Sequence, residues 1–394
     1  MNKMKLGEVC QINPKDKPED MTLQVSFIPM QSVSETGEID TSDIRSISDV
    51  CKGFTSFSEG DVLMAKITPC MENGKGAIAK GLHNGKGYGS TEFFVLRPDL
   101  ARVSSEWIYY FTAGRQFRRD CEKNMTGSAG QKRVPKTYLE KKEIPVPSLE
   151  KQRILVDNLK RTKKIISLRK QQLTELDTLV KARFVEMFGE PFSSAKWNVR
   201  ALSDVSVSLV DGSNIDPKFY QTSGEVLFLR IQNVWRNEFR LDDSVYVSQA
   251  VNESYIDTSL RNGDLLITKI GRFYTKDSSL GRVSVYRGED NRANYSNNII
   301  RVRLNGTVNS EFVNTLLNLD DYQTFIRNTS KGGTDKRALS KSLIGSYPII
   351  VPPIELQNQF AAFVEQTDKS KSVVQKALDE AQTLFDSLMQ QYFG

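Results

Sequence analysis

Few residues in this chain have the types and spacing that catalysis usually requires. His83 is the only histidine among 394 residues, so a histidine-based triad, a zincin or a multi-histidine metal site would lack its second imidazole. We expect His83 on a surface loop. No Cys-x-x-Cys spacing occurs, which argues against a zinc site or a disulfide framework; the four cysteines are Cys10, Cys51, Cys70 and Cys121.

Phosphate-binding and nuclease motifs are also absent. No GxxxxGK[ST] sequence and no GxGxxG after a strand occur, and the glycines of 74–76 and 85–87 have the wrong spacing. Two acids and a lysine can be grouped, as in Asp211, Asp216 and Lys218, but no such set is specific. No Asn/Asp-Pro-Pro-aromatic loop, typical of enzymes that methylate an extruded base, is found. We therefore expect a chain that is not an enzyme and that holds no metal or cofactor.

The composition is that of a globular protein with more than one domain. Hydrophobic residues make up 39% and charged residues 26%, and the length suits two domains. No apolar run is long enough to cross a membrane, and the first twenty residues do not resemble a signal peptide, so we expect a cytoplasmic protein without a membrane partner. The net charge of +6 permits a nucleic-acid partner without requiring one.

The elements that would position any functional residue occur twice. Residues 127–189 align without a gap on 332–394, and sixteen of these 63 pairs are identical. The similarity extends upstream, where 59–67 corresponds to 262–270 and 105–108 to 310–313. The loops between these segments differ in length and sequence. The chain therefore consists of two copies of one unit with divergent loops.

Each copy has the same predicted order of elements. Strand-like runs occur at 62–67, 93–97, 226–231, 264–270 and 299–304, separated by Gly, Asn and Pro turns. One helix is predicted at 105–119 and another at 310–327. A proline-containing segment then leads into a long helix in each copy, with Ser148 as the N-cap of the first and Gly189 and Pro191 at its end.

The two long helices carry apolar residues in a heptad pattern with the same register. About 36 residues would make roughly 54 Å of helix. Because one such helix alone would leave its apolar stripe in water, we expect the two to pack as an antiparallel pair; the alternative is that each helix covers only its own domain. The predicted helix-pair interface comprises Leu155, Leu159, Ile166, Leu173, Leu176, Val180, Phe360, Val364, Val374, Leu378, Phe385 and Leu388.

The charges of the two helices differ. Residues 151–183 carry ten basic and three acidic residues, a net +7, whereas 356–388 carry three basic and five acidic residues, a net −2. Two interpretations remain open. The first helix has a solvated face that complements the charge of the second, or its basic face lies near phosphates or an acidic partner protein.

Taken together, these segments resemble the specificity subunits of type I restriction-modification enzymes. The resemblance covers the whole chain and rests on VPSLEKQRI at 146–154, VPPIELQNQ at 351–359, the segments at 59–78 and 262–272, and the opening of the second copy at 197–212. It implies an α+β fold with two pseudo-symmetric, β-rich target-recognition domains joined by two long antiparallel coiled-coil helices. The implied segments are 1–147 and 191–352 for the recognition domains, and 148–190 and 353–394 for the helices.

The resemblance also implies a function and partners. Each recognition domain would read one half of a split, asymmetric site in double-stranded DNA, and the helices would set the spacer and bind two methyltransferase subunits. S-adenosylmethionine would bind in those subunits, and ATP and Mg²⁺ in restriction subunits, if two of these are also present. The recognition module of a related bifunctional restriction system is one alternative. A coiled-coil scaffold that binds proteins without DNA specificity is another.

Base readout requires polar and cationic side chains on loops that enter a groove. Loops that differ between the two copies are where different half-sites would be distinguished, whereas Lys66 and Lys269, at the same place in both, suggest a shared phosphate contact. Gly60-Asp61 and Gly263-Asp264 are excluded because they are typical of turns that open a strand. The predicted DNA-binding residues are Lys66, Thr68, Asn73, Lys75, Tyr88, Ser90, Thr91, Lys132, Arg133, Ser213, Asn214, Lys269, Arg272, Tyr274, Lys276, Tyr295, Asn297, Lys331, Thr334, Lys336 and Arg337.

Overall fold

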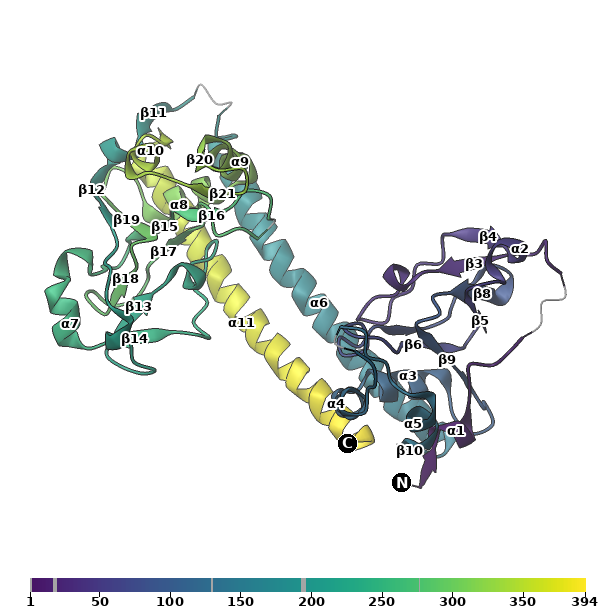
Figure 1. Cartoon of the computed structure of the whole chain (residues 1–394). Helices are drawn as coiled ribbons and strands as arrows, with labels where there is room; N and C mark the ends of the chain where they lie inside the picture. Colours follow the sequence, from purple (N-terminus) through teal and green to yellow (C-terminus); the bar gives the residue numbers. More distant parts are fainter. Residues whose placement is uncertain (1, 17–19, 129, 193–195, 276) are drawn as a thin grey trace. The chain divides into compact units, whose positions relative to one another are not determined.

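The computed structural model describes residues 2–16, 20–128, 130–192, 196–275 and 277–394 (Figure 1). By its internal contacts the chain divides into two compact units: unit 1 comprises residues 1–170 and 376–394, and unit 2 comprises residues 171–375. Two helices of 40 residues each, α6 (Leu149–Phe188) and α11 (Ile354–Phe393), contribute to both units. The division falls inside these helices and not at their ends.

Unit 1 is built on two four-stranded sheets. The first is antiparallel, in the order β2 (Cys10–Ile12), β9 (Phe93–Pro98), β6 (Val62–Ala65) and β7 (Gly76–Ile78). The second contains one parallel pair, β3 with β8, in the order β4 (Ile44–Ser46), β3 (Gln24–Ile28), β8 (Lys86–Gly89) and β5 (Thr55–Ser58). A third pair joins β1 (Lys3–Lys5) to β10 (Glu143–Pro145). The shorter helices of the unit are α1 (Leu6–Val9), α2 (Ile47–Val50), α3 (Ser105–Ala113), α4 (Arg115–Lys123) and α5 (Lys136–Lys141).

Unit 2 repeats this topology with different loops. Its antiparallel sheet has the order β12 (Ser206–Asp211), β19 (Ile299–Leu304), β15 (Leu265–Thr268) and β17 (Val283–Val285). Its mixed sheet has three strands, β14 (Val245–Val247), β13 (Val226–Leu229) and β18 (Ala293–Tyr295), the last two parallel. The pair β11 (Asn198–Ala201) and β22 (Pro348–Val351) matches β1 and β10. Unit 2 also has a small sheet of β16 (Ile270–Arg272), β21 (Lys336–Ala338) and β20 (Lys331–Gly332), and the helices α7 (Gln249–Ser254), α8 (Ser310–Asn318), α9 (Asp320–Thr329) and α10 (Lys341–Gly345). The α+β fold with a repeated unit is therefore confirmed.

The two copies share buried polar contacts as well as strands. Asp61 and Asp264 are almost completely buried and accept from Arg97 and Arg303, with shortest N–O distances of 2.8 and 2.7 Å. The preceding glycines, Gly60 and Gly263, have φ values of +87° and +86°, a conformation that disfavours other residues. These Gly-Asp pairs thus form turns before β6 and β15, as the sequence indicated.

The single helix predicted after the strands in each copy is wrong, because each copy has two. Gly114 separates α3 from α4 and Leu319 separates α8 from α9, both with extended backbone at ψ near 140° and 147°. Apolar residues continue with helical spacing through both breaks. The pattern alone therefore could not show that the helix axis changes direction.

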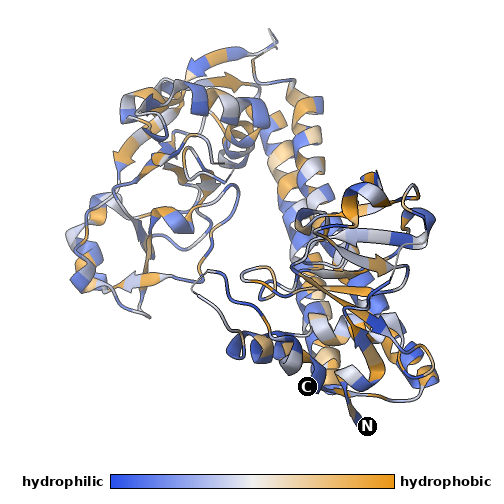
Figure 2. Ribbon diagram, turned by 45° about the vertical axis from the view of Figure 1, so that its right-hand side comes forward, coloured by the Kyte–Doolittle hydropathy of each residue, from blue (hydrophilic) through white to orange (hydrophobic). Residues whose placement is uncertain are grey.

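The long helices begin and end close to the predicted residues. The Ser148 hydroxyl accepts a hydrogen bond from the Lys151 amide at 3.4 Å, and Gly189 follows the last residue of α6 with φ +85°. At 40 residues, each helix is about 60 Å long, slightly more than predicted. Hydrophobic residues recur along both helices (Figure 2).

Within each unit the two helices run antiparallel. The core of unit 1 contains Val156 and Leu159 from the start of α6 together with Tyr392 from the end of α11. The core of unit 2 contains Phe184 from the end of α6 together with Phe360 from the start of α11. All twelve residues of the predicted helix-pair interface are buried or half-buried. Near the helix ends the most buried residues lie one position further along than the heptad pattern predicts. Val156 is more buried than the predicted Leu155, and Phe184 is fully buried, because there the helices also pack on the sheet domains.

Candidate nucleic-acid interface

In unit 1, the segment that follows β6 lies against a short hairpin that precedes α5. The Thr68 amide donates to the Lys132 carbonyl at 3.0 Å, and the Val134 amide donates to the Lys66 carbonyl at 3.0 Å. Arg133 forms β-bridges with Ile67 and with Thr126. These main-chain contacts bring together residues that are more than 60 positions apart in the sequence, among them Lys66, Thr68, Lys132 and Arg133.

The Glu92 carboxylate lies near two of the predicted DNA-binding cations of unit 1, Arg133 and Lys66. The Arg133 guanidinium binds Glu92 with N–O distances of 2.8 and 2.9 Å, and this contact, with a smaller effect of Lys66, holds the pKa of the Glu92 carboxyl below its usual range. The Lys66 ammonium also lies 5.5 Å from the centre of the Phe94 ring. Lys132, by contrast, is exposed. Lys132 is thus better placed for a first contact with a phosphate than Arg133, which stabilises the hairpin.

The remaining candidates of unit 1 lie on both sides of this hairpin. The Thr68 hydroxyl donates to Glu72 at 2.7 Å, and the Lys75 ammonium donates to the Met30 carbonyl at 3.3 Å. Asn73 and Thr91 are exposed, and Ser90 accepts from the Glu92 amide at 3.1 Å. Among the candidates of unit 1, Asn73 and Thr91 are therefore the uncharged polar residues that are exposed.

In unit 2, the corresponding segments form a complete small sheet. Arg272 of β16 is opposite Lys336 of β21, and Lys331 of β20 is opposite Ala338. The Leu339 amide donates to the Lys269 carbonyl at 2.8 Å, the same contact that Val134 makes with Lys66 in unit 1. We call residues 270–274 and 331–338 the basic hairpin. The labels β16, β20 and β21 in Figure 1 mark its place.

The basic hairpin presents cations and an aromatic ring to solvent. Tyr274 is 70% exposed, and the side chains of Arg272, Lys331, Thr334 and Lys336 are also exposed. Arg337 lies with its guanidinium carbon 4.1 Å from the centre of the Phe273 ring. Lys269 instead binds Asp211 at 2.6 Å and is mostly covered. Lys276, also predicted to bind DNA, lies outside the described residues.

Three predicted DNA-binding residues are buried, and for these the prediction is wrong. Tyr88 packs in the core beside β3, and Tyr295 is 0% exposed and donates from its hydroxyl to the Val210 carbonyl at 2.9 Å. The Ser213 hydroxyl donates to Asn294 at 3.1 Å inside unit 2. Each lies in or beside a strand whose inward face is apolar, so its side chain points into the core. Their neighbours Asn214 and Asn297 are exposed.

The basic residues of α6 do not form a single free face. Lys160 binds Glu106 at 3.4 Å, and the Lys163 ammonium donates to the Thr36 carbonyl and lies 5.7 Å from the centre of the Tyr109 ring. Burial lowers the pKa of Lys163. Some of the basic side chains of α6, such as Lys160 and Lys163, thus bind the sheet domain of unit 1 and are not available to a partner.

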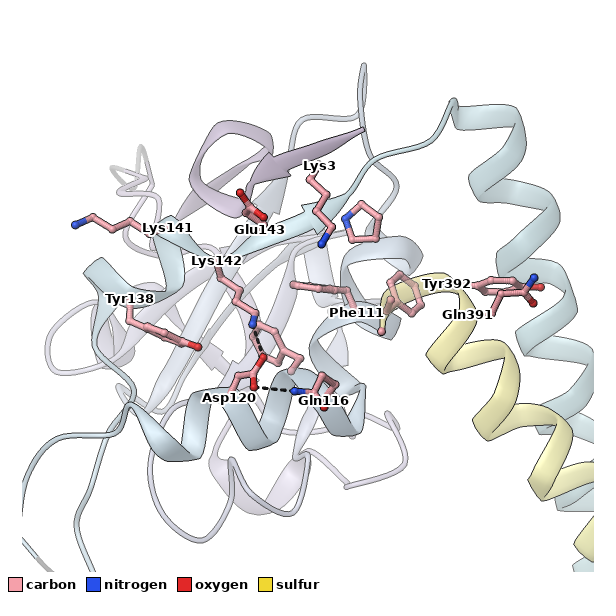
Figure 3. Close-up of a pocket in the computed structure, with 14 residues that line it drawn as sticks. Lys3, Phe111, Gln116, Asp120, Tyr138, Lys141, Lys142, Glu143, Gln391 and Tyr392 are labelled. Carbon is pink, nitrogen blue, oxygen red and sulfur yellow. Dashed lines mark hydrogen bonds and ion pairs between the residues drawn. The ribbon is translucent and has the colours of Figure 1, made fainter. Parts of the chain in front are cut away.

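A cavity of unit 1 with charged lining residues lies where α4, β10 and the last turn of α11 meet (Figure 3). Its volume is about 640 Å³. Lys142 binds Asp120 at 2.5 Å and Gln116 donates to the same carboxylate at 2.8 Å, which holds the pKa of Asp120 below its usual range. Asp120, Lys142 and Gln116 thus satisfy one another, so this pair of charges offers no free acid or base.

Sequence reasoning missed a group of arginines in unit 2. Arg240 and Arg282 lie on either side of the Trp235 ring, and Arg236 and Arg327 are close by. Arg282 is 42 residues from Arg240, so no local pattern connects them. Among the described residues, no group of three or more His, Cys, Asp and Glu side chains could hold a metal ion. No helix in the described part of the chain is long and apolar enough to span a membrane.

Comparison with known proteins identifies relatives of both units. The model of the type I restriction modification DNA specificity domain matches residues 1–178 and 195–382. The specificity subunit of the type I restriction enzyme EcoAI from Escherichia coli is 43% identical over 138 residues, and that of EcoEI is 40% identical over 136 residues. Each match covers 34% of this chain and 23% of the relative, so the chain matches less than a quarter of the length of these proteins.

Solved structures show the same fold at low sequence identity. The S subunit of a type I restriction-modification system from M. genitalium has a TM-score of 0.57 at 13% identity, covering all of this chain and 96% of that one. A chain from a study of complex assembly and conformational transition in a type I system has a TM-score of 0.60 at 16% identity, covering all of this chain and 97% of that one. With both repeats matched by the family model, the chain belongs to the type I restriction modification DNA specificity domain family.

Proposed function

We propose that this chain is the DNA-specificity subunit of a type I restriction-modification complex and that each unit reads one half of a split site in double-stranded DNA. The observation that carries the proposal is the shared frame of the two candidate interfaces. In both units the lysine that directly follows β6 or β15 is held by the same main-chain hydrogen bond. The Val134 amide donates to the Lys66 carbonyl, and the Leu339 amide donates to the Lys269 carbonyl. The exposed side chains around that frame differ.

The two units share a backbone arrangement but expose different side chains, which suits a DNA site whose two halves differ in sequence. Unit 1 presents Asn73, Thr91 and Lys132, whereas unit 2 presents Arg272, Tyr274 and Lys336. Base edges in the major groove differ in their donors and acceptors, so different amide, hydroxyl and guanidinium groups select different bases. Exposed cations near this frame in both units, such as Lys132 and Lys336, support the shared task of binding phosphates.

The long helices support the proposed docking of two methyltransferase subunits. Leu168 and Leu179 of α6 are 52% and 48% exposed, and their equivalents in α11, Val373 and Leu384, are 70% and 52% exposed. Each unit thus carries one such residue from each helix. Exposed apolar residues repeated by the internal symmetry fit two copies of one partner. In this proposal the chain itself catalyses nothing, the partners bind S-adenosylmethionine, and any restriction subunits use ATP and Mg²⁺.

Methylome sequencing of a host that expresses this chain with a cognate methyltransferase subunit tests the proposal. We expect a two-part adenine-methylation motif that disappears when this chain is omitted. Replacing Leu168 and Val373 by glutamate should weaken co-purification of the methyltransferase subunit without unfolding the chain, since both side chains are already exposed. A host methylome that is the same with and without this chain would contradict DNA specificity and favour a protein-binding scaffold.

A further inference from the structure

The arginines around Trp235 form an unusual stack within unit 2. The guanidinium carbons of Arg240 and Arg282 lie 3.5 and 3.6 Å from the centre of the Trp235 ring. The indole nitrogen donates to the Gln232 carbonyl at 2.8 Å, which fixes the ring in place. The face of an indole ring attracts cations, so Trp235 holds two like charges close to each other.

Arg282 is buried without a carboxylate partner. It is 6% exposed, and its guanidinium donates to the backbone carbonyls of Ser278 at 2.9 Å and Val234 at 3.4 Å. Among the described residues, no carboxylate lies within ion-pair distance of it, and the nearby Asp277 contacts it through its main-chain carbonyl. Burial, followed by the charges of Arg240 and Arg236, lowers the pKa of this guanidinium. A buried cation with nearby cations is stabilised by an anion that binds next to it.

A cavity of about 700 Å³ adjoins the stack and carries two further arginines, Arg236 and Arg327. Three acids also line it, but Glu238 binds Arg240 at 2.6 Å and Asp320 binds Lys181 at 3.0 Å. The cavity therefore has an excess of positive charge, with Asp277 as its third acid. We call the cavity, with Trp235 and these four arginines, the arginine pocket.

The arginine pocket belongs to one half of the chain only. The Arg240 amide donates to the Asn233 carbonyl, and in unit 1 the equivalent contact joins the Asp40 amide to the Ser32 carbonyl. An acid in unit 1 thus occupies the place of an arginine in unit 2, and the unit 1 hairpin between these positions carries Glu35 and Glu38. Since the shared frame folds with either charge, the arginines are not required by the fold.

One hydrogen bond links the arginine pocket to the basic hairpin. Arg327 of the pocket donates to the Phe273 carbonyl at 3.3 Å. Arg337 of the basic hairpin stacks on the ring of the same Phe273. The α9 helix that carries Arg327 lies beside β20 and β21 in Figure 1. A DNA backbone that contacts the basic hairpin would therefore pass close to the pocket.

We propose that the arginine pocket binds a phosphate group of the DNA backbone at the half-site read by unit 2, with Arg236 and Arg240 as its contact residues. This inference rests on the proposed function and adds to it a sequence-independent anchor present in one half only. Guanidinium groups form paired hydrogen bonds with phosphate oxygens, and such contacts raise affinity without reading bases. Arg282, held by carbonyls, positions Trp235 and Arg240 and supplies charge.

The salt dependence of DNA binding by the full-length chain tests this proposal. The probe is a DNA duplex of random sequence, and the variants are the double substitution R236Q/R240Q and the matched control R261Q/R292Q, which removes the same charge from exposed arginines elsewhere in unit 2. Each lost phosphate contact should reduce the slope of log K against log salt by about 0.9. We expect R236Q/R240Q, which loses the contact with one phosphate, to lose about 0.9 in slope and roughly tenfold in affinity near 0.1 M salt, and the control to change neither appreciably.

Each outcome separates this proposal from the proposed function. Equal slopes for R236Q/R240Q and the control, with wild-type binding intact, would overturn the arginine pocket as a phosphate site while leaving DNA specificity in place. Loss of methyltransferase co-purification in R236Q/R240Q with an unchanged slope would assign the pocket to an acidic protein segment and also overturn the proposal. A wild-type chain that binds no duplex, with or without its methyltransferase subunit, would refute both.

Discussion

Two glutamines at the start of the long helices should be among the most sensitive positions in the chain. Gln357 is 0% exposed, and its side-chain oxygen accepts from the Asn309 amide at 2.8 Å while its nitrogen donates to the Pro352 carbonyl at 2.7 Å. Gln152 makes the same two contacts in unit 1, with Ser104 at 2.9 Å and Pro147 at 2.9 Å. Each glutamine thus joins its long helix to the N-terminus of α8 or α3.

The substitution Gln357→Ala leaves a buried N–H and a buried C=O without partners. Each unsatisfied group costs about 1–3 kcal/mol, so we expect a total loss near 3 kcal/mol in the free energy of unfolding. For a unit of this size, 1 kcal/mol corresponds to about 2–4 °C, which predicts a fall in Tm of about 6–12 °C.

Differential scanning calorimetry of the full chain measures this loss. Gln359→Ala is the matched control, because Gln359 is exposed two residues further along the same helix and alanine favours helix formation. Gln152→Ala should lower Tm by a similar amount. A decrease in Tm of less than about 2 °C for Gln357→Ala would mean that water replaces the glutamine, and the reasoning from buried hydrogen bonds would be refuted.

Three further predictions follow from the helices, the corrected residues and the charged cavity of unit 1. Inserting one heptad after Lys170 and one after Gln375 lengthens both helices by about 10 Å and should widen the methylated motif by about three base pairs with both half-sites unchanged; an unchanged spacing in the methylome would show that the helices do not set it. Tyr295→Phe removes a buried hydrogen bond and should cost about 1 kcal/mol of stability without altering the motif, whereas Tyr274→Ala should weaken DNA binding and leave Tm unchanged; the reverse result would restore Tyr295 as a DNA contact. Because Lys142 lowers the pKa of Asp120 in the folded state, this pair stabilises the fold above the ordinary carboxyl pKa and loses that contribution as the pH falls below about 4. In the variant Asp120→Asn, the free energy of unfolding should therefore fall less steeply below about pH 4 than in the wild type. An unchanged pH dependence in this range would contradict the role of the pair.

The repeat and the helices could be predicted from the sequence because their signals are local or periodic. Ser148 and Gly189 mark the ends of α6 by their own conformational preferences, and the heptad pattern marks the side of each helix that is buried. The buried side of each helix departs from the heptad pattern only near the helix ends. There Phe184 packs on Phe312 of the sheet domain, with ring centres 5.2 Å apart. A pattern along one helix contains no information about what covers its end.

The repeat of one unit, the gapless match of 127–189 to 332–394 and the divergence of the loops could all be read from the amino-acid sequence. Which loop residues reach solvent depends instead on the folded arrangement of the strands. Tyr274 and Tyr295 have equal propensity for an interface, yet one is 70% and the other 0% exposed, because the strand partners of each residue set the direction of its side chain. The arginine pocket likewise depends on pairings across the fold, since Arg240, Arg282 and Arg327 come from distant parts of the chain and meet only when the strands and α9 are in place.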